Sequence, residues 1–217
     1  MDIQTILIAL PPLLISVILH EIAHAWVAEK LGDPTARNLN RINLNPLVHI
    51  DLFMTIILPT MLILAHSPVV FGGAKPVPVN PRYFKNPRKG MMLVAVAGPI
   101  VNLILAVICY LGILIFGKML LLAPENSPKY YELLAGWLVQ GLFINVVLAV
   151  FNMFPIPPLD GGRIMVGLLP EKAARVWARL EPYGFFIVFG LLYIKAIDAV
   201  LIPVLRFSKE MITLALI

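Results

Sequence analysis

Long apolar runs separated by short polar segments dominate the chain. A helix needs about 20 apolar residues to cross a bilayer, and runs of this length occupy residues 2–27, 91–116 and 132–154. A fourth span is expected over residues 183–205, followed by a tail at 206–217 that is either an interfacial helix or disordered. The pattern predicts an all-α polytopic membrane protein, a bundle of about four to six transmembrane helices. We expect residues 1–217 to form a single membrane-embedded domain.

A shorter apolar stretch lies between the first two clear spans. Residues 55–65 are interrupted by Pro59, and residues 71–80 alternate Pro, Val and Gly in a way that cannot continue a helix. We expect residues 55–65 to dip into the bilayer and return, and the segment after them to be extended or strand-like. Together they are predicted to form a re-entrant/β-strand element.

Composition supports the membrane class and excludes several others. The chain is 60% hydrophobic and 13% charged, with a net charge of +5, whereas soluble domains carry about 25% charged residues. Cys109 is the single cysteine, which excludes an internal disulfide and a cysteine-based metal cluster. No motif for nucleic-acid recognition is visible, so we expect no nucleic-acid partner.

The first span contains the motif His20-Glu21-Ile22-Ala23-His24. Histidines four residues apart lie on one helix face, so both rings can reach one ion. Neutral imidazole is a common zinc ligand, and Glu21 beside it is a candidate general base for an attacking water. Polar residues in an apolar span are costly unless they have a function. We therefore predict a catalytic zinc site, one Zn²⁺ per chain, with His20 and His24 as ligands.

Asp160 is the best candidate for a third ligand. The remaining histidines, His49 and His66, are predicted to lie in loops or at helix ends. Asp160 follows a proline-rich run at the end of the third span and precedes Gly161-Gly162, which allows close backbone approach. The alternative for Asp160 is an ordinary helix-terminating turn.

The proposed ligands constrain the topology. If His20, His24 and Asp160 meet, the first and third clear spans must run in the same direction, with one crossing between them. Twelve Lys and Arg residues then share one side of the membrane, against four on the other. By the positive-inside rule the N-terminus lies outside and the metal site lies toward the cytoplasmic side of the cell membrane.

Four motifs together resemble the site-2 protease family of intramembrane zinc metalloproteases, over roughly residues 13–165. They are His20–His24, Gly73–Pro78, Ala97-Gly98-Pro99 with Asn102, and the run from Asn152 to Gly161. No PDZ insertion interrupts this stretch, so the resemblance is to a compact subgroup without that domain. The resemblance implies His20, His24 and Asp160 as zinc ligands and Glu21 as the base. It also implies a catalytic role for Asn152, which would help to hold the substrate or the developing oxyanion.

The expected function is hydrolysis of peptide bonds within or near transmembrane segments of membrane-protein substrates, as in regulated intramembrane proteolysis. The resemblance implies that the Gly73–Val79 segment pairs with an unwound substrate, with Val77–Val79 as the edge available for pairing. The alternative is a membrane metal-ion transporter or metal-binding protein. Transporters usually show internal repeats and two broken helices in corresponding positions, and neither is evident in this sequence.

Overall fold

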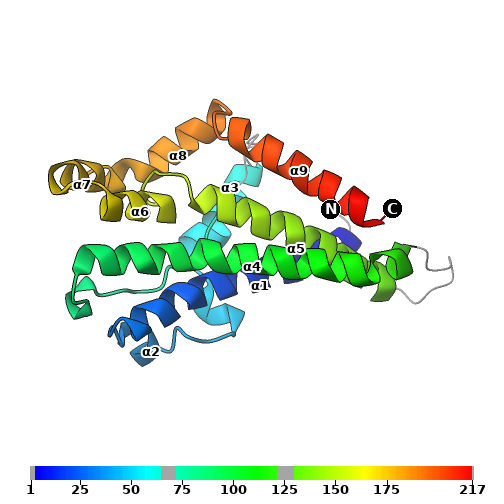
Figure 1. Ribbon diagram of the computed structural model, residues 1–217, viewed down its shortest axis with the longest axis horizontal. Coiled ribbons are helices and arrows are strands. Elements are labelled where there is room, and N and C mark those ends of the chain that lie inside the picture. Colours follow the sequence, from blue (N-terminus) through cyan, green and yellow to red (C-terminus); the bar gives the residue numbers. More distant parts are fainter. Residues whose placement is uncertain (1–2, 65–71, 122–129, 217) are drawn as a thin grey trace.

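Figure 1 shows the computed structural model of the chain, which describes residues 3–64, 72–121 and 130–216. Within these ranges the regular structure is helical. The α-helices are α1 (Ile3–Lys30), α2 (Thr35–Asn38), α3 (Leu58–Leu64), α4 (Pro87–Leu121), α5 (Tyr130–Asn152), α6 (Asp160–Leu168), α7 (Glu171–Ala178), α8 (Gly184–Tyr193) and α9 (Asp198–Leu216). Four shorter helical turns are η1 (Pro46–His49), η2 (Leu52–Ile57), η3 (Pro81–Tyr83) and η4 (Glu181–Tyr183).

Three of these helices, α1, α4 and α5, are long and apolar enough to cross a membrane. They lie side by side as the core of the molecule (Figure 1). Many leucine and isoleucine side chains on their outer faces are exposed, for example Ile104 at 51% and Leu111 at 48%. Such faces suit a surrounding of lipid tails, so the chain is a multi-pass membrane protein.

Contacts between α1 and α5 show that the two helices run in the same direction. Gly136, near the start of α5, packs against Ile8. Further along both helices, Gly141 lies against Pro12. The parallel course of the first and third clear spans is the arrangement that a shared site requires.

Helix α4, which lies between α1 and α5 along the chain, runs in the opposite direction to both. Val94, near its start, contacts His24, and Asn102, two turns later, contacts His20. Small residues allow this close packing, since Ala25, Ala28 and Ala95 are almost completely buried. Close approach through small side chains is typical of helices that associate in membranes.

The predicted fourth span is not one continuous helix. It is divided into α8 and α9, which meet at a bend of 65° and form an arch over α5 (Figure 1). The break falls at residues 194–197, where Lys195 adopts a left-handed backbone with φ of 58°. The tail at 206–217 belongs to α9 as far as Leu216. The described residues therefore contain three spans, or four if the bent pair counts as one, at the low end of the predicted number.

The element predicted to be re-entrant begins with η2 and α3. Its two ends lie together, because the Gly73 amide donates to the Met54 carbonyl at 3.0 Å and the Thr55 hydroxyl donates to the Gly73 carbonyl at 2.6 Å. A segment that dips and returns needs this geometry. Ala65, the last residue of the stretch predicted to be re-entrant, and His66 beside it lie outside the described residues.

Residues 72–80 are extended but form no β-ladder with any part of the chain that the structure describes. The strand half of the predicted re-entrant/β-strand element is therefore not confirmed. Its prolines account for this, because Pro76 and Pro78 have no N–H to donate to a ladder.

Candidate metal centre

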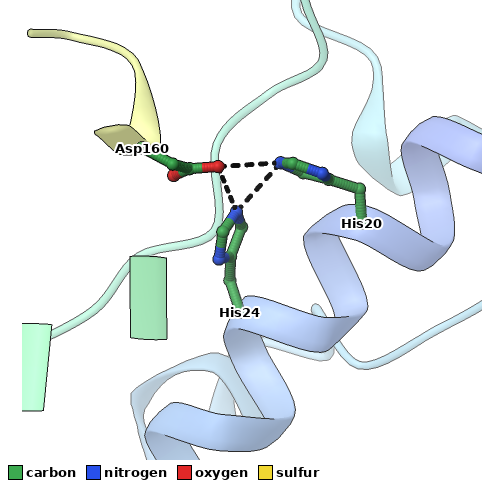
Figure 2. Close-up of side chains that lie close together, drawn as sticks. All are labelled: His20, His24 and Asp160. Atoms are coloured by element: carbon green, nitrogen blue, oxygen red, sulfur yellow. Dashed lines mark hydrogen bonds and ion pairs between the residues drawn. The ribbon is translucent and has the colours of Figure 1, made fainter. Parts of the chain in front are cut away.

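Three side chains converge on one point beside the C-terminal half of α1, namely those of His20, His24 and Asp160 (Figure 2). The Nε2 atoms of the two imidazoles are 3.0 Å apart, and the Asp160 Oδ2 atom lies 3.2 Å from His20 Nε2 and 3.3 Å from His24 Nε2. All three residues are buried. The structure thus brings together the three predicted ligands, although Asp160 lies far from the histidines in the sequence.

The size of this triangle fits a zinc ion. Ligand atoms about 2.0 Å from a tetrahedral centre are about 3.3 Å from one another, because a tetrahedron's edge is about 1.6 times its centre-to-corner distance. The observed separations of 3.0 to 3.3 Å are close to that value. A fourth corner remains for water or substrate, as in catalytic zinc sites.

Neighbouring acceptors fix the protonation of both rings. His20 Nδ1 lies 2.6 Å from the Oδ1 atom of Asn102, and His24 Nδ1 lies 2.8 Å from the carbonyl oxygen of Val94. Each Nδ1–H therefore donates outward, which leaves the Nε2 lone pairs facing the centre. Second-shell partners of this kind orient histidine ligands in metal sites.

Charge balance at the centre also requires a cation. Two imidazole lone pairs and a carboxylate oxygen would repel one another at these distances unless a proton or a metal ion lies between them. The Asp160 Oδ2 atom is buried and accepts no regular hydrogen bond from the described residues. The donor set of two imidazoles and one carboxylate is one that zinc accepts.

Gly98 of α4 forms the floor under the two rings. A Cβ atom at this position would lie 2.6 Å from Nε2 of His20 and 2.6 Å from Cε1 of His24. No side chain larger than hydrogen fits there without displacing a ligand. The requirement explains why α4 has a glycine here despite the low helix propensity of that residue.

Asp160 is held at the centre by the tightly folded loop between α5 and α6. It is the first residue of α6, and the following glycines, Gly161 and Gly162, pack directly against the backbone of that loop. A Cβ at Gly162 would lie 2.6 Å from the carbonyl carbon of Ile156. The far end of α6 is tied to α4 by Arg88, whose guanidinium donates to the carbonyls of Gly167 and Leu169.

Glu21 and Asn152, the two predicted catalytic residues, have different surroundings. The Glu21 carboxylate accepts a hydrogen bond of 3.0 Å from the backbone N–H of Val77 in the extended segment. The Asn152 amide donates to the Leu148 carbonyl of its own helix at 3.0 Å. Glu21 is therefore linked to the extended segment, whereas the contact seen for Asn152 is local.

A chain of buried polar residues that the motif reasoning did not assign to the centre supports His20. The Asn102 amide donates to Asn145 Oδ1 at 2.8 Å, and Asn145 in turn donates to the Gly141 carbonyl at 2.8 Å. Both asparagines are buried, Asn102 completely. The available signal was their position, because asparagine in an apolar span needs a hydrogen-bond partner.

Comparisons with known proteins agree on one family. The model for "Peptidase family M50" matches residues 8–139 and 129–194. The chain is 40% identical over 201 residues to "Putative zinc metalloprotease YwhC" of Bacillus subtilis, covering 92% of this chain and 86% of that protein. It is 31% identical over 185 residues to "Putative zinc metalloprotease Rip2" of Mycolicibacterium smegmatis, covering 85% and 66%. No solved structure matches the chain.

Replacing Gly98 tests the packing under the rings. We expect Gly98→Ala to weaken zinc binding by about 10- to 100-fold, because the added methyl displaces both imidazoles. Competition with a zinc chelator in detergent measures the change. The matched control is Gly190→Ala, since a Cβ at Gly190 meets nothing within 4 Å. Equal zinc affinity in the two variants would contradict the assigned geometry.

Asn102 offers an independent test of the second shell. We expect Asn102→Leu to weaken zinc binding by about 10- to 100-fold, because His20 loses the acceptor that orients it. Asn102→Asp keeps that acceptor and should retain more zinc than the leucine variant at the same chelator concentration. Loss of zinc to the same extent in both would show that the acceptor is not what matters.

Proposed function

The chain belongs to peptidase family M50, and from that membership and the geometry above we propose which residues carry out its reaction. It is an intramembrane zinc metalloprotease. We assign His20, His24 and Asp160 as the zinc ligands, Glu21 as the general base and Asn152 as an auxiliary hydrogen-bond donor. The observation that carries this assignment is the triangle of three ligand atoms separated by 3.0 to 3.3 Å.

Zinc held by His20, His24 and Asp160 would supply Lewis-acid chemistry, since it would lower the pKa of water and polarise a peptide carbonyl. Glu21 accepts the proton of the attacking water and later transfers it to the leaving amine. An amide side chain has two N–H donors, so Asn152 can keep its helix contact while it donates to the substrate oxygen. The ligands and Glu21 together form an HExxH-type centre.

The substrates in this proposal are transmembrane segments of other proteins. Peptide bonds in a helix are internally hydrogen-bonded and shielded, so the substrate must unwind near the site. The extended Val77–Val79 stretch, which leads away from Glu21, can pair with such an unwound strand. The metal-transporter alternative is not favoured, because it accounts neither for the family membership nor for a glutamate placed between the two histidines.

We propose that the N-terminus faces outside and that the centre lies toward the cytoplasm. The distribution of Lys and Arg supports this orientation through the positive-inside rule. Twelve of these residues lie at the end of α1 and in the loop after it, in the segment before α4 and the first turn of α4, and in the region of α6 and α7. These regions fall on one side when α1 and α5 run in parallel.

Glu21→Gln is the direct test of the proposed reaction. The variant should keep its zinc, because the three ligands are unchanged, and it should lose cleavage of a membrane-protein substrate by more than about 100-fold. Zinc content by atomic absorption and product by gel analysis are measured on the same detergent preparation. Normal cleavage by this variant would eliminate Glu21 as the base.

Cysteine labelling tests the orientation. In a Cys109→Ser background, the Arg179→Cys variant should react with an impermeant maleimide in inverted membrane vesicles and not in intact cells. A cysteine at Thr5, near the start of α1, should show the opposite pattern. The reverse labelling of both sites would overturn the proposed orientation and leave the catalytic assignment in place.

A further inference from the structure

The extended segment before α4 is held to the rest of the protein along most of its length. Its backbone is bonded at Gly73 to Met54 and Thr55, at Lys75 to His49 and Arg41, at Val77 to Glu21 and at Asn80 to Asp33. These hydrogen bonds fix the segment relative to α1, to the loop that follows α1 and to η2.

Two buried charged side chains from the loop after α1 hold the segment on either side of Val77. The Arg41 guanidinium donates to the Lys75 carbonyl at 2.6 Å and to the Pro76 carbonyl at 3.4 Å. The Asp33 carboxylate accepts a hydrogen bond of 2.6 Å from the backbone N–H of Asn80. Arg41 is 6% exposed and Asp33 is fully buried. One residue thus holds carbonyls and the other holds an amide.

Neither charge is balanced by an opposite charge within 4 Å among the described residues. Burying an unpaired charge is costly unless hydrogen bonds compensate for it. For Arg41 the observed compensation is two carbonyls of the extended segment, and for Asp33 it is the Asn80 amide together with its local contacts to Thr35. Both buried groups therefore help to fix the position of the segment.

Val77 is the point where this positioning reaches the candidate centre. Pro76 and Pro78 on either side have no N–H, so Val77 offers the single backbone donor between Lys75 and Val79. That donor is used by the Glu21 carboxylate at 3.0 Å. Any shift of the segment would move the hydrogen bond that orients Glu21.

We propose that Arg41 and Asp33 are positioning residues that clamp the extended segment so that the Val77 N–H holds the Glu21 carboxylate in place. This inference rests on the proposed function, because it takes Glu21 to be the base. The same clamp sets the depth and direction of the Val77–Val79 stretch with which a substrate strand would pair. Neither residue contacts the ligand triangle, so their effect falls on the chemical step and not on zinc binding.

Arg37 provides a matched control for Arg41. It lies in α2, four residues before Arg41, but its guanidinium is largely exposed and pairs with Glu29 on the surface. Exposed pairs of this kind contribute little. Arg37→Met and Arg41→Met remove the same charge from the connection between α1 and η1, and only the second removes the contact with the extended segment.

The experiment measures zinc content, kcat and KM for wild type, Arg41→Met, Arg41→Lys and Arg37→Met on one transmembrane substrate in detergent. We expect Arg41→Met to bind zinc stoichiometrically and to lose about 100-fold in kcat/KM, mainly through kcat, because a catalytic group displaced by about 1 Å costs this much. Arg41→Lys, which keeps the positive charge and one donor nitrogen, should recover part of the rate. Arg37→Met should stay within about twofold of wild type.

A second pair of variants tests the same step if Arg41→Met fails to fold. Val77→Pro removes the donor to Glu21 without touching a buried charge, and should lower kcat with zinc retained. Its control is Ala74→Pro, at a position whose N–H shows no bond to the described residues. If both Val77→Pro and the folded Arg41 variants cleave as fast as their controls, the clamp is wrong.

These outcomes differ from failure of the proposed function. If Glu21→Gln cleaves normally, the catalytic assignment is wrong, and the clamp proposal, which depends on it, is wrong as well. If Glu21→Gln is inactive while Val77→Pro and Arg41→Met are fully active, Glu21 remains the base and only the clamp is refuted. Faster hydrogen exchange at the Val77 amide in Arg41→Met than in Arg37→Met would supply the structural evidence.

Discussion

Three hydrogen-bond acceptors facing one another across about 3 Å in an apolar interior form the interaction on which the rest of the structure depends. Such an arrangement is stable only around a cation, and the surrounding elements keep it from relaxing. Val94 and Asn102 turn the imidazoles inward, Gly98 leaves room for them, and the loop before α6 holds the carboxylate. Val94, Gly98 and Asn102 all lie on α4, so the precision of the centre depends on the close approach of α1, α4 and α5 through small residues.

Much of this arrangement could be predicted from the sequence, because polar residues in apolar spans are few and costly. The histidine spacing predicted one shared face, and the demand that Asp160 reach it predicted the parallel course of α1 and α5 that the structure shows. The roles of Glu21 and Asn152 remain predictions. What could not be read from spacing was the second shell, because the contacts of Gly98 and Asn145 depend on how α4 is rotated against its neighbours.

Two regions could be predicted only in part from the sequence, for identifiable physical reasons. Hydropathy predicted a single fourth span because it measures composition and does not detect a left-handed residue such as Lys195. Alternation of Val with Pro predicted a strand-like segment, yet the missing amides of Pro76 and Pro78 leave no continuous ladder to form. In place of sheet partners the segment uses the buried side chains of Arg41 and Asp33, which no periodicity reveals.

The candidate ligands come from the first long helix and from the short helix that follows α5, with α4 and α5 between them in the chain. A ribosome making this protein therefore releases both histidines long before the carboxylate exists. A partially synthesised chain contains only two of the three candidate ligands, so the complete donor set first exists when α6 has been made.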